Sequence, residues 1–187
     1  VLGSRLWGTA TKDSDWDIMV ITKAESPLRE INHRSVDAMV MGPKTYEERL
    51  AEHRFKELCS LWLPAENVKK QRLDGSKLFK LDLEQLRARG LEDSAKDWDR
   101  CQKYLERTGD RDAMARGKKV ACSAIRELRL CTQIATSGQI QDFEAASSDF
   151  EDLRNTFGAA LGWTCFDAEF GGRLLGLQTE LMRATCG

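Results

Sequence analysis

The chain has 187 residues, of which 41% are apolar and 32% are charged, a balance typical of a globular protein with a strongly hydrated surface. This length is enough for one domain with a sizeable core or for two small lobes. The formal net charge of -1 excludes a global positive field, so a nucleic-acid partner would have to be held by a local basic patch.

Cysteine usage indicates a reducing compartment. The six cysteines include no CxxC pair, and with only two histidines no zinc-binding spacing is present. Scattered cysteines of this kind indicate free thiols. The sequence has no signal peptide and no apolar run long enough to span a membrane, so we expect an intracellular protein, cytoplasmic by default, with no membrane partner. Because the chain begins with Val1 directly at its most informative motif, we also expect residues before it.

The first part of the chain predicts a small strand-rich region. Residues 1–2 read as the end of a strand, and the polar, glycine-containing residues 3–15 as a turn, a short helix and a loop. Residues 17–21 are apolar on both faces, which predicts a short strand in the centre of its sheet. Residues 35–41 predict a second strand, ended by a Gly-Pro pair.

After this pair the pattern becomes helical. Capping and breaking residues divide it into helices expected over residues 45–63, 81–89, 94–108, 110–137, 147–157 and 167–184. The longest carries an apolar stripe at helical spacing, formed by Ala121, Ala124, Ile125, Leu128, Cys131 and Ile134. We therefore predict an α+β fold, in which a small mixed sheet in a core over residues 1–64 is followed by a helical lobe over residues 65–187.

The opening stretch, GSRLWGTATKDSDWDIMVI, combines groups that suit a phosphate with groups that suit a metal. Gly3 allows close approach of a phosphate, and the hydroxyl of Ser4 can donate a hydrogen bond to one. Asp15 and Asp17 are two residues apart at the start of a strand, so alternation directs both carboxylates to one face. Two neighbouring carboxylates repel each other unless a cation lies between them, and Mg²⁺ typically takes one or two carboxylates plus substrate phosphates.

Asp37 is an acidic residue inside the second apolar strand. A neighbouring strand, parallel or antiparallel, would bring it beside Asp15 and Asp17. Three carboxylates suit two Mg²⁺ ions, the arrangement that clamps the attacking and leaving oxygens in phosphoryl transfer. The alternative is an aspartate at a strand edge facing solvent, but burial of an unpaired carboxylate among the apolar neighbours Val36, Ala38 and Val40 would be costly.

These residues resemble the signature of the DNA polymerase beta-like nucleotidyltransferase superfamily. The minimal nucleotidyltransferases carry the pattern GSRxxGxAxxxSDxDxxV, which the chain matches at Gly3, Ser4, Arg5, Gly8, Ala10, Ser14, Asp15, Asp17 and Val20. The resemblance covers residues 1 to about 41. The chain departs from the family in the strand before the Gly-Ser pair, which is almost absent here.

The resemblance implies a role for each matched residue. Gly3 and Ser4 would hold the triphosphate of a nucleotide, with Arg5 either beside them at the nucleotide or bracing the loop. Asp15 and Asp17 would bind two Mg²⁺ ions, for which Mn²⁺ is a substitute. Asp37 would hold the catalytic metal and help to activate the acceptor hydroxyl. All three aspartates are thus expected to be both catalytic and metal-binding.

The helical part has a further resemblance to phage-type and bacterial nucleotidyltransferases of this superfamily, in the stretches EHRFKELCSLW and KKVACSAIRELRL. In the second stretch Lys119, Ser123 and Arg126 share one helix face, apart from the apolar stripe. Lys119 and Arg126 are therefore candidates for contact with the triphosphate or the acceptor. The alternative is a solvated face, which an amphipathic helix has in any case.

Two functions remain open from the sequence. The first is an Mg²⁺-dependent enzyme that uses an NTP, ATP included, and transfers the nucleoside monophosphate to an acceptor hydroxyl. The acceptor is open between an RNA 3' end, a protein and a small molecule, although the weak net charge disfavours a long nucleic-acid footprint. The second is a catalytically silent nucleotidyltransferase-fold subunit of a larger assembly.

Overall fold

The structure is a computed structural model that describes residues 1–70, 73–107, 110–156 and 162–186. It has the predicted α+β composition, with a three-stranded sheet followed by helices. The chain forms two compact units, Val1–Gln85 and Leu86–Gly187, each of which is described by itself. The boundary between these two units lies later in the chain than the boundary expected between residues 64 and 65, which separates a core from a helical lobe. The expected boundary stays a prediction.

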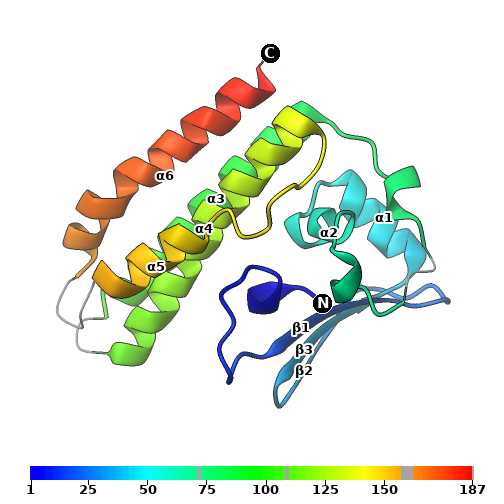
Figure 1. Ribbon diagram of the computed structural model, residues 1–187, viewed down its shortest axis with the longest axis horizontal. Coiled ribbons are helices and arrows are strands. Elements are labelled where there is room, and N and C mark those ends of the chain that lie inside the picture. Colours follow the sequence, from blue (N-terminus) through cyan, green and yellow to red (C-terminus); the bar gives the residue numbers. More distant parts are fainter. Residues whose placement is uncertain (71–72, 108–109, 157–161, 187) are drawn as a thin grey trace. The chain divides into compact units, whose positions relative to one another are not determined.

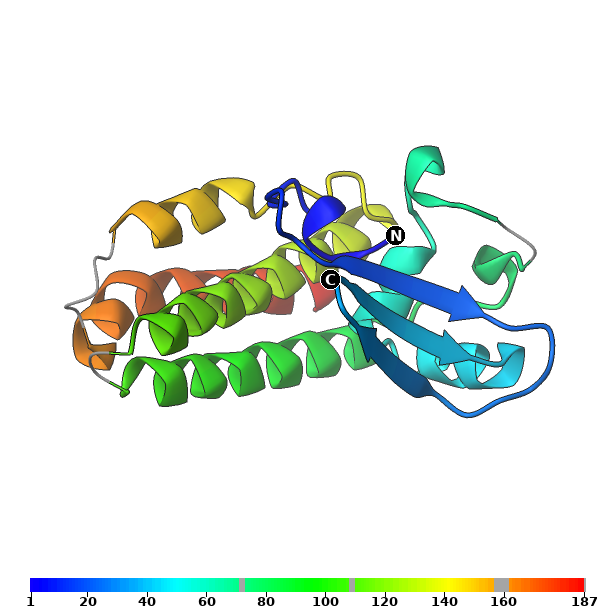
Figure 2. The same cartoon turned by 90° about the horizontal axis from the view of Figure 1, so that it is seen from below.

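The sheet of the first unit consists of β1 (Trp16–Ile21), β2 (Arg29–His33) and β3 (Val36–Met41), in the order β1-β3-β2 (Figure 2). β3 is the central strand, parallel to β1 and antiparallel to β2. The prediction that residues 17–21 form a central strand is therefore wrong, because β1 lies at an edge of the described sheet. Its apolar side chains are not all covered, since Val20 remains 39% exposed.

β2 is a strand that the sequence pattern does not predict. All five of its residues, REINH, are exposed, so the strand has no buried apolar face to produce an alternating pattern. It pairs with β3 through a tight connection in which Arg34 adopts a left-handed φ of 51°. Pairing with β3, rather than local propensity, accounts for this strand.

The two faces of the sheet differ in their burial. On β3, Met39 and Met41 are buried and share a face with Asp37, because side chains alternate along a strand. The opposite face carries exposed apolar side chains from the two edge strands, of which Ile31 is 50% and Trp16 42% exposed. The helices α1 (Pro43–Ala51) and α2 (Phe55–Ser60) lie on one side of the sheet (Figure 1).

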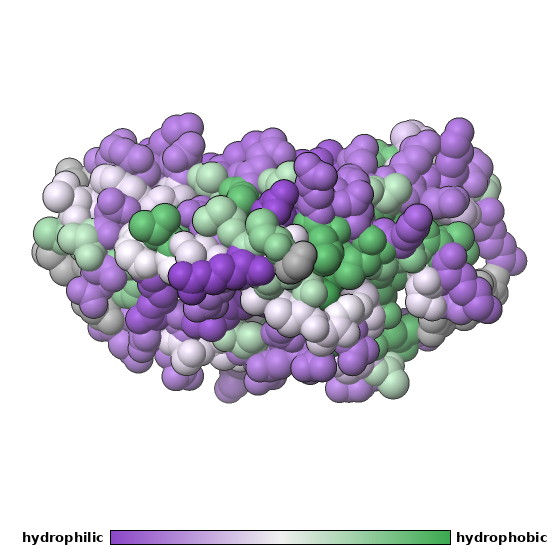
Figure 3. All heavy atoms as spheres, turned by 90° about the horizontal axis from the view of Figure 1, so that it is seen from above, coloured by the Kyte–Doolittle hydropathy of each residue, from purple (hydrophilic) through white to green (hydrophobic). Residues whose placement is uncertain are grey.

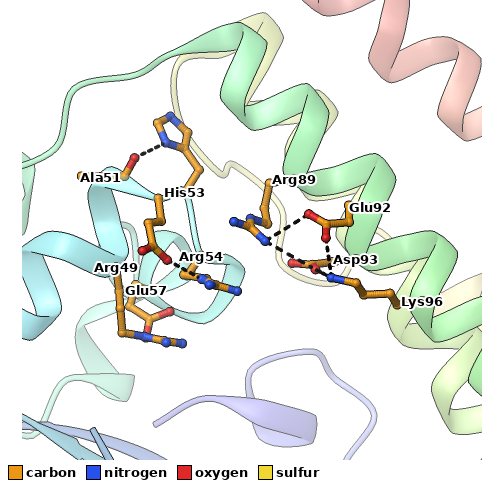
Figure 4. Close-up of polar contacts among 10 residues, drawn as sticks. Arg49, Ala51, His53, Arg54, Glu57, Arg89, Glu92, Asp93 and Lys96 are labelled. Atoms are coloured by element: carbon orange, nitrogen blue, oxygen red, sulfur yellow. Dashed lines mark hydrogen bonds and ion pairs between the residues drawn. The ribbon is translucent and has the colours of Figure 1, made fainter. Parts of the chain in front are cut away.

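The single helix predicted over residues 45–63 is wrong, because the chain breaks between α1 and α2. His53 adopts a left-handed φ of 54° at the break, and its ring is buried. Its Nδ1 lies 3.1 Å from the carbonyl oxygen of Ala51 (Figure 4). Its Nε2 accepts a hydrogen bond from the backbone N–H of Asp82 at 3.0 Å. The buried carboxylate of Glu57 on α2 is paired with Arg49 of α1, which joins the two short helices. The unit also contains the short 3-10 turns Ala65–Asn67 (η2) and Gly75–Lys77 (η3).

The second unit is built from α3 (Leu83–Leu105), which begins at the end of the first unit, α4 (Arg111–Ser137), α5 (Ser147–Thr156) and α6 (Trp163–Thr185). The helices expected over residues 81–89 and 94–108 are one continuous helix, α3, and that prediction is wrong. Gly90 lies inside this helix, where a Cβ would come within 3.0 Å of Leu181 and 3.3 Å of Cys131, so glycine permits close helix packing rather than ending the helix. The Ser94 hydroxyl donates to the carbonyl of Leu91 within the helix. The expected stop at residues 108–109 lies outside the described residues.

The longest helix, α4, is confirmed. The side chain of Asp110 caps its first turn by accepting hydrogen bonds from two backbone N–H groups, and Gly138 ends it with a φ of 76°. Every residue of the predicted apolar stripe is buried. The two helices expected after it are also present as α5 and α6. None of the helices among the described residues has the length and apolar character needed to cross a membrane.

Candidate functional site

Asp17 and Asp37 lie side by side in the sheet of the first unit. β1 and β3 are parallel, and their register pairs Asp17 directly with Asp37. Register partners on adjacent strands, which lie about 5 Å apart, direct their side chains to the same face of the sheet. The sequence-based expectation that a neighbouring strand brings Asp37 beside Asp17 is thus confirmed. The sequence left parallel and antiparallel pairing open, and the two strands are parallel.

A residue that the sequence analysis missed extends this pair into a row. Asn32 on β2 is the register partner of Asp37 on its other side, so Asp17, Asp37 and Asn32 follow one another across the three strands. Asn32 and Asp37 are both exposed. The only signal that points to Asn32 is the pairing of β2, a strand without an apolar pattern, so sequence reasoning had no means of finding it.

The Gly-Ser turn packs directly against Asp17. The backbone N–H of Leu2 donates to the carbonyl oxygen of Asp17 at 2.7 Å and forms an isolated antiparallel bridge. Gly3 then begins the 3-10 turn η1 (Gly3–Arg5) with a left-handed φ of 67°. A Cβ at Gly3 would lie 1.7 Å from Oδ2 of Asp17. Glycine is therefore required here for two reasons, the backbone conformation and the close approach of this carboxylate.

Ser4 is half-buried in the middle of this turn. Its carbonyl oxygen accepts a hydrogen bond from the backbone N–H of Thr9 at 3.0 Å, which closes the loop behind it. Its hydroxyl makes no hydrogen bond to any residue within the described ranges. The Ser4 hydroxyl thus has no partner among the described residues and directly follows Gly3, the residue that lies against the Asp17 carboxylate.

Arg5 braces the loop that joins the turn to β1. Its Nη2 donates to the carbonyl oxygen of Ser14 at 2.9 Å, and its guanidinium lies 4.0 Å from the centroid of the Trp16 ring. These contacts hold both ends of the loop together. The sequence left two roles open for Arg5, contact with the nucleotide and bracing of the loop, and the contacts correspond to the second. Contact of Arg5 with a nucleotide stays a prediction.

Asp15 directly precedes β1 and is exposed. The hydrogen bonds that connect this part of the chain with the start of β3 begin at the next residue. There the backbone N–H of Trp16 donates to the carbonyl oxygen of Ser35 at 2.7 Å. The carboxylates of Asp15 and Asp37 form no hydrogen bond or ion pair with any residue that the structure describes. Both are thus accessible acceptors at the same end of the sheet.

Among the described residues, no group of three or more His, Cys, Asp and Glu side chains is placed so that it could hold a metal ion. The joint convergence of Asp15, Asp17 and Asp37 expected from the sequence is therefore not seen. The adjacent pair Asp17 and Asp37 does match the donor set of Mg²⁺, which takes one or two carboxylates and completes its shell with phosphates and water.

Lys119 and Arg126 lie on α4, in the second unit. Lys119 is exposed, and its carbonyl oxygen accepts a hydrogen bond from the hydroxyl of Ser123 at 3.2 Å. Nη2 of Arg126 lies 3.5 Å from the sulfur of Cys122 on the same helix, so this side chain is engaged locally. Because both residues belong to the other compact unit, their contact with a nucleotide stays a prediction.

No protein-family model, curated protein or solved structure significantly matches this chain.

Proposed function

We propose that the chain is a nucleotidyltransferase, which transfers a nucleoside monophosphate from an NTP to an acceptor hydroxyl and releases pyrophosphate. The observation that carries this proposal is the parallel register that pairs Asp17 with Asp37 directly beside the Gly3 turn. The signature-like sequence GSRLWGTATKDSDWDIMVI supports it independently, because its spacing selects Asp17, one of the two aspartates that the sheet pairs.

Each residue of the site has a defined task in this proposal. The Ser4 hydroxyl donates to the triphosphate, and Gly3 keeps the turn close to the Asp17 carboxylate. Asp17 and Asp37, with Asp15 next to them, would hold Mg²⁺, which when bound neutralises the triphosphate and favours ionisation of the acceptor hydroxyl. Arg5 keeps the loop in place through Ser14. The Asp37 carboxylate is exposed, so an acceptor hydroxyl could reach it from solvent.

Labelling of an acceptor tests this function. The protein is incubated with Mg²⁺, each α-labelled NTP in turn, and a mixture of total RNA and cell extract. We expect one class of molecule to be labelled by the wild type and by the Asp13→Asn variant, whose exposed aspartate lies in the same loop outside the sheet. Label should be lost with Asp37→Asn.

The silent-subunit alternative predicts a different result. No NTP would then label any acceptor, and the chain would be recovered with a protein partner. Equal labelling by the wild type and by Asp37→Asn would also contradict the proposed site, because the amide cannot carry the negative charge that metal binding uses.

A further inference from the structure

The sheet of the first unit has one open face. Register partners across the three strands, and alternation along each strand, place nine residues on it. They form the outer face and are Trp16, Ile18 and Val20 of β1, Val36, Ala38 and Val40 of β3, and Arg29, Ile31 and His33 of β2. None of the nine is buried, whereas Met39 and Met41 on the other face are. Figure 2 views the sheet from this side, with α1 and α2 behind it.

The outer face combines apolar side chains with basic ones. Seven of its nine residues are apolar, the other two are Arg29 and His33, and none is acidic, although the chain as a whole has a net charge of -1. A further cation, Arg5, holds its guanidinium 4.0 Å from the centroid of the Trp16 ring, and Trp16 remains 42% exposed. Figure 3 shows the molecule from the side opposite to Figure 2, where polar side chains (purple) surround the apolar ones (green).

The size and charge of the outer face distinguish between its possible occupants. At the usual spacings in a sheet, its backbone spans about 13 Å along the strands and about 10 Å across them. This area is far smaller than the ~800 Å² that each partner buries in a stable protein–protein interface. A second copy of the chain would also bring Arg29 and His33 against basic residues with no acidic partner. The area does match the roughly two or three bases of single-stranded RNA that stack on a sheet with exposed aromatic side chains.

We propose that the outer face binds single-stranded RNA and that this RNA supplies the acceptor hydroxyl, the second part resting on the proposed nucleotidyl transfer. The Trp16 ring and the apolar side chains receive the flat faces of the bases, and Arg29 attracts the phosphates. Trp16 and Val36 start two parallel strands, so both lie at one edge of the sheet. Asp17 and Asp37 follow them directly, so an RNA 3' end that passes this edge reaches the candidate site on the other face.

Binding of RNA without Mg²⁺ or NTP tests the outer face by itself. Fluorescence anisotropy measures the affinity of the full chain for a labelled RNA single strand of about 12 nucleotides, and for the same strand annealed to its complement. We expect the single strand to bind at least about tenfold more tightly, because the bases of a duplex are already stacked on one another and cannot reach an aromatic side chain.

Substitutions on the outer face locate the bound strand. Ile31→Glu places a negative charge in the middle of the face, at a side chain that is 50% exposed, and should weaken binding about tenfold. Arg29→Gln should weaken binding and reduce the slope of log affinity against log salt concentration by about 0.7, the value for one phosphate contact. Lys56→Gln removes the same charge at an exposed position of α2 and should change neither quantity. The melting temperatures of all three variants should stay close to that of the wild type, because these positions are exposed.

Labelling of RNA separates this inference from the proposed function. With Mg²⁺ and an α-labelled NTP, Ile31→Glu should label RNA about tenfold less than the wild type at low RNA concentration, in proportion to its lower affinity. Asp37→Asn should bind RNA as the wild type does and label none. If the wild type binds RNA through the outer face and labels nothing, the nucleotidyl transfer fails and the binding face stands.

Three results would overturn the binding face. The first is no binding of the single strand, and a dimer in sedimentation equilibrium would then assign the face to a second copy. The second is equal affinity for single strand and duplex, which would attribute binding to charge alone. The third is wild-type affinity in both Ile31→Glu and Arg29→Gln, which would place the RNA elsewhere on the chain.

Discussion

Gly3 shows how one residue sets the geometry of the candidate site. Its φ of 67° disfavours any side chain, and a Cβ would overlap Oδ2 of Asp17. We predict that Gly3→Ala lowers the free energy of unfolding by about 1–2 kcal/mol for the left-handed backbone alone. The Asp17 side chain must also move, so nucleotide binding should fall. Urea denaturation measures the first effect.

Ser4→Ala is the matched control for this prediction, because it alters the neighbouring residue without a left-handed φ. Its free energy of unfolding should stay close to that of the wild type. Equal stability of Gly3→Ala and Ser4→Ala would contradict the role assigned to the turn.

His53 makes the stability of the first unit depend on pH. Burial lowers the pKa of His53 below its ordinary value of 6.5. The hydrogen bond from the Asp82 N–H requires an unprotonated Nε2, so Nδ1 carries the proton that faces the Ala51 carbonyl. The unfolded chain therefore takes up a proton first as the pH falls, which favours unfolding. The contribution of His53 to stability is complete above pH 6.5 and is lost progressively below it.

Thermal unfolding between pH 8 and pH 5 measures this effect. We expect the melting temperature of the wild type to fall below about pH 6.5. The fall should be smaller in His53→Asn, which cannot ionise and tolerates a left-handed φ. His33→Asn changes the exposed histidine of β2 and should retain the profile of the wild type. Superimposable profiles for His53→Asn and the wild type would rule out this histidine as the source.

At the scale of elements, Asp149 connects three helices of the second unit. This buried carboxylate on α5 accepts hydrogen bonds from Arg129 of α4 at 2.8 Å and from Arg173 of α6 at 2.8 Å. Asp149→Ala leaves both guanidinium groups without this acceptor. We predict a loss of about 2–3 kcal/mol in the free energy of unfolding, as for hydrogen bonds to charged groups.

Asp152→Ala provides the comparison, since this exposed carboxylate pairs, among the described residues, with Arg173 alone, at 3.1 Å. An exposed ion pair contributes about 0–1 kcal/mol, so its loss should be small. Chemical denaturation of the two variants measures and compares their losses in the free energy of unfolding. A similar small loss for both would mean that α5 is held by its apolar contacts only.

The elements differ in how far the sequence predicts them. α4 is predicted at both ends because its signals are local: Asp110 caps it, and Gly138 ends it. The break between α1 and α2 is not predictable in this way, because the buried ring of His53 is held by Asp82, a residue distant in the sequence. The helix end expected at residue 89 is wrong for a similar reason, because the packing of Gly90 against Leu181 depends on tertiary contact, which no local pattern contains.

At the scale of the whole molecule, the candidate site is partly predictable. The sequence selects Asp15 and Asp17 by their spacing and Asp37 as an acidic residue inside an apolar strand, and the sheet pairs Asp17 with Asp37. Asn32 could not be selected, because its strand is defined by pairing with β3 rather than by its own pattern. The contribution of Lys119 and Arg126 is likewise not determined by sequence spacing, since these residues belong to the other compact unit.

Binding of Mg²⁺ and ATP is the measurement that tests the central claim most directly. Isothermal titration of the full chain with ATP, with and without Mg²⁺, should show binding by the wild type that depends on the metal. Asp17→Asn with Asp37→Asn removes the register-paired carboxylates and should abolish the Mg²⁺-dependent part, while Asp13→Asn should retain it. Equal Mg²⁺-dependent affinity in the double variant and the wild type would contradict the assignment of this pair as the metal and nucleotide site.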